Sequence, residues 1–266
     1  MLNFLFVHIF WLTTVQVLYI ILFVKRNGVI KMIKAVLFDL DGTLLPMDQD
    51  TFLKAYFGGI SAHLAPFGYV PEELIKAIWR GTMAMINNNG EMSNEAVFWN
   101  VFSAIYGEKA REDEPKFEEF YREKFPAVKA VCGYNPKSRE LLDILHARGI
   151  KTALATNPIF PAIATNERIR WAGLDTDDFE LVTTYENIGL CKPNPEYFRE
   201  VAKRIGATPE ECLMVGNDVS DDMPARALGM QVFLLTDCLI NKSDEDLSAY
   251  PHGDFDALIN YINSII

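Results

Sequence analysis

The sequence predicts an α/β fold, a three-layer doubly wound parallel sheet with an α-helical module inserted after its first strand. From about residue 135 onward, short apolar strand patterns alternate with longer helical patterns, which is typical of a parallel sheet covered by helices on both faces. From about residue 46 to 134 only helical periodicity occurs. We therefore expect a core domain built from residues 32–46 and 135–266, and a helical domain from residues 47–134.

The first strand is expected at residues 35–38, a continuous apolar run that suits a strand buried on both faces. Asp39 and Asp41 follow at its carboxyl end, where open α/β sheets place their ligands. Residues two apart on a strand point the same way, so both carboxylates can face one site and favour a bound cation or a raised pKa. Gly42 permits a sharp turn, and Thr43 adds a hydroxyl. Taken alone, the pattern also fits a strand that ends in solvated acids.

The inserted region is expected to be a four-helix module. Four segments carry apolar residues at three-and-four spacing, and glycines, prolines or polar clusters separate them. We expect the large apolar side chains of this module to form its helix-bundle core rather than a substrate pocket. The residues concerned are Trp79, Met83, Met85, Phe98, Trp99 and Tyr106.

Polar side chains also follow the second and third predicted strands. Thr156 and Asn157 offer a hydroxyl and an amide that could hold a phosphate oxygen. A simple hydroxyl or amide turn is the alternative interpretation of this pair. Lys192 follows the next strand and could neutralise both a nucleophilic carboxylate and a transferring phosphoryl group. A solvated loop lysine fits that position as well.

The fourth predicted strand ends in the turn GNDVSDD, at residues 216–222. Its hard oxygen ligands come from Asn217, Asp218, Asp221 and Asp222, and they could face those of the first strand to hold Mg²⁺. The alternative is a helix N-terminus that is enriched in acids. That alternative explains one or two of these residues more easily than all of them.

Composition excludes several classes of protein. Half of the 266 residues are hydrophobic and 23% are charged, so the chain is globular. A net charge of −11 argues against a broad basic face for nucleic acid, although a bound divalent cation would still allow a small phosphorylated substrate. The four cysteines form no CxxC pair, which favours free thiols in a reducing compartment.

The N-terminal residues 1–24 contain no charged side chain, and Lys25 and Arg26 follow them. A helix of that length could span a membrane, and the positive-inside rule would then keep the rest of the chain in the cytoplasm. Alternatively, residues 1–31 are not part of the functional protein, because a start at Met32 gives a complete domain. Both interpretations predict a cytoplasmic catalytic domain, and membrane contact only if residues 1–24 are an anchor.

The four polar sets, in this order and at successive strand ends, resemble the motifs of the haloacid dehalogenase-like (HAD) hydrolase superfamily. The resemblance covers residues 33 to about 240, with a Rossmann-like core, and the helical insert looks like the C1 cap of that family. The matching residues are Asp39-Leu40-Asp41-Gly42-Thr43 for motif I, Thr156 for motif II, Lys192 for motif III, and Gly216-Asn217-Asp218 with Asp222 for motif IV.

The resemblance implies a role for each catalytic residue. Asp39 would attack phosphorus and form an aspartyl-phosphate, which splits one hard displacement into two easier ones. Asp41 would protonate the leaving alcohol and then activate the hydrolytic water. Thr156 and Lys192 would hold the phosphoryl oxygens.

The same resemblance implies a metal and further phosphate contacts. Mg²⁺ would be held by the Asp39 carboxylate, the Asp41 backbone carbonyl and Asp218, and we also assign Asp222 to the metal site. Motif IV can equally be read with Asn217 and Asp221, which keep the same spacing; a carboxylate is the better ligand, which favours Asp218. We expect the phosphate to contact three further residues, Gly42, Thr43 and Asn157.

Asp41 discriminates between branches of the superfamily. The dehalogenase and phosphonate-cleaving branches lack an acid at this position, so its presence favours a Mg²⁺-dependent phosphatase that acts on a small phosphorylated metabolite. A phosphomutase keeps this acid and stays an alternative, as does a non-catalytic module that binds a phosphorylated ligand. The sequence does not reveal the substrate or the oligomeric state.

Overall fold

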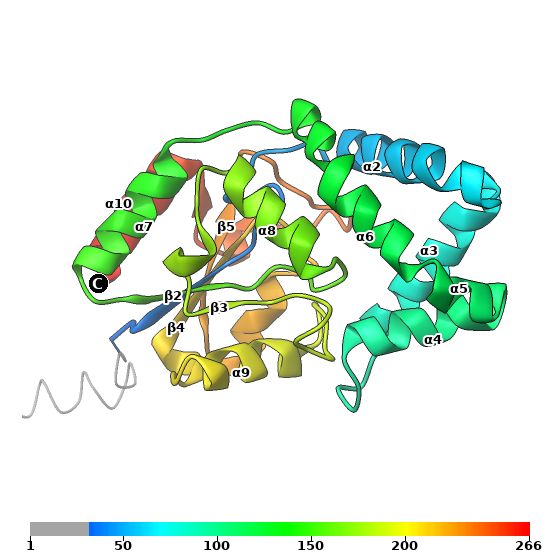
Figure 1. Cartoon of the computed structure of the whole chain (residues 1–266). Coiled ribbons are helices and arrows are strands. Elements are labelled where there is room, and N and C mark those ends of the chain that lie inside the picture. Colours follow the sequence, from blue (N-terminus) through cyan, green and yellow to red (C-terminus); the bar gives the residue numbers. More distant parts are fainter. Residues whose placement is uncertain (1–31) are drawn as a thin grey trace, which may run out of the picture. The chain divides into compact units, whose positions relative to one another are not determined.

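The computed structural model describes residues 32–266, and six strands in that range form one sheet in which every neighbouring pair is parallel (Figure 1). The spatial order is β3-β2-β1-β4-β5-β6, so the first strand lies near the centre. The strands are β1 (Ala35–Phe38), β2 (Lys151–Leu154), β3 (Leu181–Val182), β4 (Cys212–Gly216), β5 (Gln231–Leu235) and β6 (His252–Gly253). The parallel α/β sheet predicted from the sequence is confirmed.

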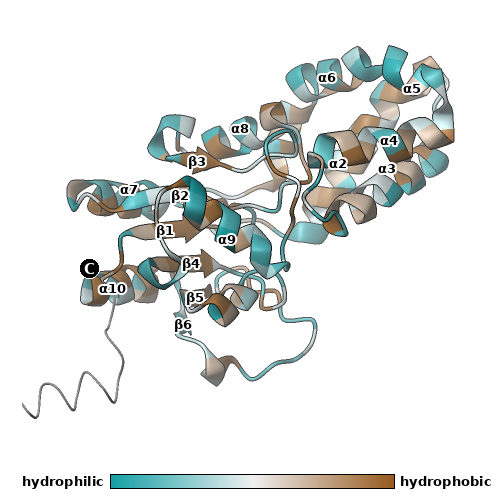
Figure 2. Ribbon diagram, turned by 90° about the horizontal axis from the view of Figure 1, so that it is seen from below, coloured by the Kyte–Doolittle hydropathy of each residue, from teal (hydrophilic) through white to brown (hydrophobic). Residues whose placement is uncertain are grey.

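Helices cover both faces of the sheet, because the side chains of each strand alternate between two apolar layers. Val36 and Phe38 of β1 belong to the core cluster that includes one group of helices, whereas Ala35 and Leu37 pack in the cluster on the other face. Figure 2 shows the central strands as hydrophobic and the surrounding helices as mixed. The first group is α7 (Lys137–Ala147), α8 (Ala162–Trp171) and α10 (Phe255–Ile265), and the second face carries α9 (Pro195–Arg204).

A helical module lies between β1 and β2 in the chain. It leaves and rejoins the core at adjacent points, since Met47 and Cys132 form an antiparallel bridge and the Gly133 N–H donates to the Pro46 carbonyl at 2.7 Å. The insert therefore begins and ends at one place on the core. Its elements are α2 (Gln49–Leu64), α3 (Pro71–Ile86), α4 (Asn94–Tyr106), α5 (Glu108–Glu112) and α6 (Glu114–Glu123), with the 3₁₀ helices η1 (Ala65–Phe67) and η2 (Phe125–Val131).

Local sequence explains where these helices begin and how they pack. The Asp48 side chain accepts a hydrogen bond from the Thr51 N–H at 2.8 Å at the start of α2, and Ser93 caps α4 in the same way. Aromatic side chains fill the space between the helices; Phe102 and Phe120 are fully buried. The apolar cluster of the module is continuous with that of the sheet. The insert is therefore fixed to the core by a shared hydrophobic interior.

The structure differs from the sequence-based expectation at four elements. β3 has only two residues, because the Asn187 side chain binds the Val182 carbonyl and the Thr184 N–H, the groups that a longer strand would pair. β6 was not predicted, since a two-residue edge strand carries no periodic signal. The helix expected after β4 is the short 3₁₀ helix η5 (Met223–Leu228), and α5 adds a fifth helix to the insert. The other 3₁₀ helices are η3 (Thr176–Asp178), η4 (Pro209–Glu211) and η6 (Leu247–Ala249).

The N-terminal hydrophobic segment, residues 1–24, lies outside the described residues. Within residues 32–266 no helix is both long enough and apolar enough to cross a membrane. All four cysteines lie in the described part and are free thiols, as the sequence predicts.

Candidate active site

The four polar sets lie at one edge of the sheet. Asp39 continues the pairing of β1 with β4, since its N–H donates to the Val215 carbonyl at 2.9 Å. The motif IV turn begins directly after Val215, so it lies beside Asp39. Because all strands are parallel, Thr156 and Asn157 follow β2 at the same edge. The strand order therefore brings together residues that are as far apart in the chain as Asp39 and Asp222.

Lys192 binds two carboxylates in the interior. Its Nζ lies 2.7 Å from Asp39 Oδ1 and 2.7 Å from Asp222 Oδ1. Burial alone would lower the pKa of Lys192, but the charges of Asp222 and Asp39 more than offset that effect and the pKa is raised. Lys192 is therefore held in its charged form next to Asp39, where it can neutralise an anion.

Asp222 was expected in the metal site, and its contacts favour a different role. One oxygen accepts from Lys192, and Oδ2 accepts from the Asp218 N–H at 3.0 Å. Burial raises the pKa of Asp222, while Lys192 acts in the opposite direction. A Cβ at Gly216 would overlap this carboxylate, so glycine leaves the space that it fills. Because both oxygens are already engaged, Asp222 is placed to orient Lys192 rather than to bind a metal.

Both polar atoms of the Asn217 side chain also have hydrogen-bond partners. This disfavours the alternative in which Asn217 and Asp221 bind the metal. Its Oδ1 accepts from the Thr43 hydroxyl at 3.0 Å, and its Nδ2 donates to the Cys238 carbonyl at 2.7 Å. Gly42 has φ +86°, and a Cβ there would overlap the Asn217 amide. Asn217 therefore fixes the turn after β1 against the turn after β4, and Gly42 and Thr43 serve this packing in the absence of a ligand.

The oxygen groups at this edge suit Mg²⁺. Asp218 Oδ1 accepts from the N–H groups of Ser220 and Asp221 at 2.8 and 3.1 Å, and its Oδ2 has no partner within residues 32–266. In the same described range no three His, Cys, Asp or Glu side chains gather into a metal cluster. Mg²⁺ needs only one or two carboxylates, because it keeps several waters and shares substrate phosphate oxygens. Asp39 and Asp218, with the Asp41 carbonyl, form a donor set of that kind.

Asp41 forms an ion pair that the sequence did not reveal. Its Oδ2 accepts from Arg168 Nη1, and its Oδ1 is buried with no partner in the described part of the chain. Burial raises the pKa of Asp41 to about 6, the Arg168 charge opposes this rise, and Asp39 adds to it. A carboxyl with this pKa can both give and take a proton near neutral pH.

Arg168 is itself almost fully buried, at 1% exposure. It lies over the Phe160 ring, 4.5 Å from the centroid, and its Nη2 donates to the Thr165 hydroxyl at 3.3 Å. A signal for this residue was present in the sequence: Ala164, Arg168 and Ala172 form one row at four-residue spacing on the apolar face of α8. A charged residue in such a row has to find a partner inside the protein.

Thr156 and Asn157 lie shortly after the end of β2. The Thr156 carbonyl accepts from the Tyr197 hydroxyl at 2.7 Å and from the Thr183 hydroxyl at 2.8 Å, which fixes the backbone after β2. Asn157 Nδ2 donates to Asp221 Oδ2 at 3.3 Å, and its Oδ1 is buried without a partner among the described residues. Asp221 thus supports Asn157.

Asn94 links the inserted module to the catalytic loops, and sequence reasoning missed it. It is fully buried at the start of α4, and its Nδ2 donates to the Pro158 carbonyl at 3.0 Å and to Cys191 Sγ at 3.2 Å. Pro158 and Cys191 are the immediate neighbours of Asn157 and Lys192. One amide therefore holds the loops of motifs II and III against the cap.

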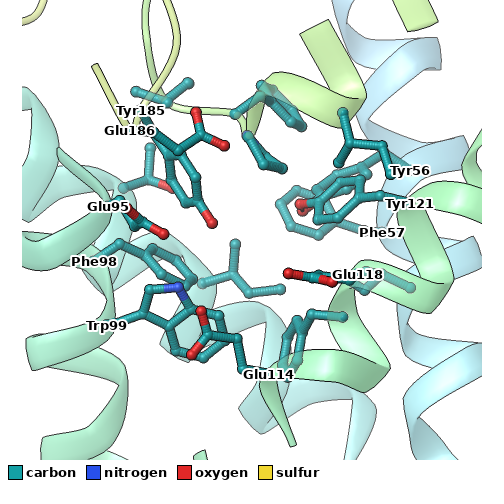
Figure 3. Close-up of a pocket in the computed structure, with 18 of the residues that line it drawn as sticks. Tyr56, Phe57, Glu95, Phe98, Trp99, Glu114, Glu118, Tyr121, Tyr185 and Glu186 are labelled. Atoms are coloured by element: carbon teal, nitrogen blue, oxygen red, sulfur yellow. Dashed lines mark hydrogen bonds between the residues drawn. The ribbon is translucent and has the colours of Figure 1, made fainter. Parts of the chain in front are cut away.

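A cavity of about 300 Å³ lies between the helical module and the core loops (Figure 3). Trp99 is a buried core residue and Phe98 packs against the core, as expected, and both also line the cavity. Trp79 lines it as well and is 43% exposed. Met85 is buried, as expected of a core residue, whereas Met83 is half exposed. Helical periodicity cannot distinguish a core face from a cavity wall, because both are apolar.

The comparison with known proteins identifies the family. The family profile for haloacid dehalogenase-like hydrolases matches residues 33–229. The chain belongs to this family. The superfamily assignment made from the motifs is therefore confirmed, and so is the expectation of an enzyme.

Relatives and solved structures agree with this assignment. The chain is 26% identical to the pyrophosphatase PpaX of Bacillus velezensis over 83% of this chain and 90% of that protein. It is 29% identical to a phosphoglycolate phosphatase of Xylella fastidiosa over 74% and 77%. A crystal structure of a HAD phosphatase from Thermococcus onnurineus matches with a TM-score of 0.56 at 22% identity, covering 86% of this chain and 98% of that one.

A 2-haloacid dehalogenase from Pseudomonas syringae matches with a TM-score of 0.59 at 21% identity, over 88% of this chain and 99% of that one. Phosphatases and a dehalogenase of this family therefore share the fold. The fold alone does not choose between their reactions, and the residues of the site have to do so.

Proposed function

We propose that this HAD hydrolase is a Mg²⁺-dependent phosphatase that hydrolyses a small phosphorylated metabolite through an aspartyl-phosphate on Asp39. The observation that carries the proposal is the buried contact of Lys192 with Asp39, with a second acid, Asp41, two residues further on. The phosphatases named among the relatives support the reaction type. The four free thiols support a reducing, cytoplasmic location.

In the first step, an Asp39 carboxylate oxygen attacks phosphorus while the bond from phosphorus to the leaving oxygen breaks. Asp41 gives its proton to that oxygen, so the alcohol departs neutral. In the second step a water attacks the phosphorus of the aspartyl-phosphate, Asp41 takes the proton from this water, and the Asp39 carboxylate leaves. Inorganic phosphate is the product. Proton transfer by a positioned carboxyl typically contributes about 10²–10⁴ in rate.

The other residues prepare the site for charge. Lys192 lies against Asp39 and can stay in contact with the phosphoryl oxygens, while Asp222 keeps its ammonium oriented. The hydroxyl of Thr156 and the amide of Asn157 are expected to hold further phosphoryl oxygens. Arg168 orients the Asp41 carboxyl through their ion pair.

Asp39, the Asp41 carbonyl and Asp218 are the groups that would hold Mg²⁺. When bound, this ion would neutralise the negative charge of the phosphoryl group and so favour attack by a carboxylate.

The test is hydrolysis of p-nitrophenyl phosphate by the purified protein. We expect turnover that requires Mg²⁺, is lost with a chelator, and falls below detection in Asp39→Asn. Asp143→Asn, which changes a carboxylate that is 63% exposed on α7, serves as the control and should keep full activity. Acid-quenched enzyme should carry phosphate on Asp39 by mass spectrometry. Undiminished turnover in Asp39→Asn would refute the mechanism. With a sugar phosphate as substrate, transfer of the phosphoryl group to a second hydroxyl instead of release of inorganic phosphate would indicate a phosphomutase.

A further inference from the structure

The cavity between cap and core is separate from the catalytic residues and has walls of two kinds. Helices α2, α3, α4 and α6 and the core segments 159–163 and 185–186 enclose a volume of about 300 Å³. This volume lies at the lower end of the range for small-molecule sites. None of the catalytic residues proposed above lines it. The cavity is therefore sized for the part of a substrate that does not react.

Aromatic rings form the first kind of wall. Phe57 and Trp79 lie with ring centroids 5.6 Å apart, and Phe98 and Trp99 with centroids 5.4 Å apart. Tyr121 and Tyr185 add further rings on the other sides (Figure 3). The face of an aromatic ring carries partial negative charge, which attracts a cation that has shed part of its water.

Carboxylates form the second kind of wall. Glu95, Glu114, Glu118 and Glu186 all line the cavity, and no Lys, Arg or His does so in the part of the chain that the structure describes. Burial raises the pKa of Glu95, and the charges of Glu186 and Glu114 raise it further. These acids are therefore close enough to repel one another, and a positive ligand would relieve that repulsion.

Two arginines near the cavity offset only part of this charge. Arg111 lies 3.5 Å from Glu114 and over the Trp99 ring, and Arg122 lies 3.9 Å from Glu118 in a largely exposed pair. The fourth acid, Glu186, accepts only the backbone N–H of Ala162 in this part of the structure. The cavity keeps a net negative charge after both arginines are counted.

Trp99 supplies an independent sign of a ligand. It is only 3% exposed, and its indole nitrogen points into the cavity in Figure 3. The N–H lies towards the Tyr185 hydroxyl, but no hydrogen bond of good geometry satisfies it among the described residues. A buried donor without a partner is costly, so a ligand oxygen near the cationic group would satisfy it.

One layer of side chains lies between this cavity and Asp41. Phe160 lines the cavity, Arg168 lies against its ring, and Arg168 forms the ion pair with Asp41. Asp41 is the acid that would protonate the leaving group. If the cavity holds part of the substrate, that part belongs to the leaving group, because Asp41 would protonate the leaving oxygen.

We propose that this cavity binds a positively charged organic group, so that the enzyme prefers phosphate esters whose alcohol carries an amine or a quaternary ammonium. This inference rests on the proposed phosphatase function. The four glutamates repel leaving groups that carry a carboxylate or a second phosphate, and the aromatic rings favour a cation with apolar substituents. The glutamates and the aromatic rings together therefore select the leaving group by its charge and by its shape.

The first experiment compares two esters of the same shape, phosphocholine and 3,3-dimethylbutyl phosphate, which differ by one positive charge. We expect kcat/KM to be at least about tenfold higher for phosphocholine, which corresponds to a buried cation–π contact of ordinary strength. Equal rates, or a preference for the neutral ester, would overturn the inference.

The second experiment changes the walls. In Glu95→Gln/Glu114→Gln the preference for phosphocholine over the neutral ester should fall towards one, mainly through a higher KM. Glu119→Gln, on the exposed side of α6, is the matched control and should keep both the preference and the activity. Circular dichroism and thermal unfolding confirm that each variant folds. An unchanged preference in the double variant would contradict the assignment of these acids.

A binding measurement separates this inference from the proposed function. Tetramethylammonium should bind to Asp39→Asn in calorimetry, and binding should weaken in the same protein with the double glutamine change. Turnover of p-nitrophenyl phosphate without cation binding or charge preference would remove the inference and leave the phosphatase intact. Cation binding without turnover of any ester would support the cavity and refute the phosphatase.

Discussion

Charged groups are arranged in opposite ways in two regions of the molecule. The first is the catalytic edge, which is the carboxyl edge of the sheet with Asp39, Asp222 and Lys192, and the second is the cavity that Glu95 lines. At the catalytic edge, Asp39, Asp222 and Lys192 satisfy one another through short charge-assisted contacts. In the cavity, Glu95 has no cation within ion-pair distance in the described structure, and its charged neighbours are three other acids and one arginine, Arg111. The first region is thus organised before any ligand arrives, whereas the negative charge of the second is only partly offset by Arg111 and Arg122.

The exceptions at the catalytic edge sharpen this contrast. Among residues 32–266, Asp41 Oδ1 and Asn157 Oδ1 are buried without partners, and they belong to residues proposed to contact the reacting groups. Unsatisfied polar atoms in a native protein call for an explanation of this kind. In a preorganised active site, only the atoms that contact the reacting groups lack a hydrogen-bond partner. In a specificity pocket, the atoms without a partner are those that contact the rest of the substrate.

The largest effect is expected for Lys192→Met. It leaves two buried carboxylates without their cation, and breaking one side of a buried ion pair costs about 3–5 kcal/mol. Urea unfolding should show this loss of stability, and phosphatase activity should vanish. Lys203→Met removes a lysine that is 79% exposed on α9, and we expect a change below about 0.5 kcal/mol. Similar small losses for both variants would show that the catalytic edge is not held by this contact.

Arg168→Met should be next in size. Asp41 would lose the only side-chain partner that it has within the described residues, and with it a fixed orientation. We therefore expect kcat to fall by about 10–100-fold, matching the 1–3 kcal/mol of a lost buried hydrogen bond to a charged group. KM should change little, because Arg168 touches the acid and not the substrate. Arg168→Lys should restore part of kcat. A change in KM alone would assign Arg168 to substrate binding instead.

The catalytic edge could be predicted from the sequence because its geometry follows from local rules. A buried strand that ends in two acids fixes where Asp39 and Asp41 lie, and parallel strands bring their carboxyl ends to one edge. The contact of Asp222 with Lys192 could not be predicted from the sequence, because it depends on the directions of side chains in a turn. Motif spacing gave two possible registers, and only the contacts of Asn217 and Asp222 favour one of them.

The cavity could not be predicted for a different reason. Trp79 belongs to the apolar pattern of α3, and Phe98 and Trp99 belong to that of α4. Such a pattern is the same whether the helix face packs or lines a void. The glutamates that share the cavity come from α4, α6 and the loop after β3, so no local pattern connects them. The position of the insert relative to the core decides their neighbours, and this depends on tertiary packing.

Asn94→Ala tests the link between the two regions. Removing its amide leaves the Pro158 carbonyl unsatisfied and frees the loops that carry Asn157 and Lys192, at a cost of about 1–3 kcal/mol. We expect lower stability in urea and a lower kcat/KM for every ester. Asn100→Ala, exposed on the same helix, should change neither quantity. An active, equally stable Asn94→Ala would show that the cap and the catalytic loops are positioned independently.

The smallest effect, and the most selective, is expected for Gly81→Ala on α3. A Cβ at this position would lie 2.5 Å from Phe98 Cδ2, so the ring has to shift and the cavity changes shape. The strain is offset in part by the better helix propensity of alanine, so net stability should change by no more than about 1 kcal/mol. KM for phosphocholine should rise by about three- to tenfold, while acetyl phosphate, which is too small to reach the cavity, keeps its KM. Gly58→Ala on α2 is the matched control, because its Cβ would meet nothing within 4 Å. If both alanine variants shifted KM alike, the cause would lie in the helices and not in the cavity that Phe98 lines.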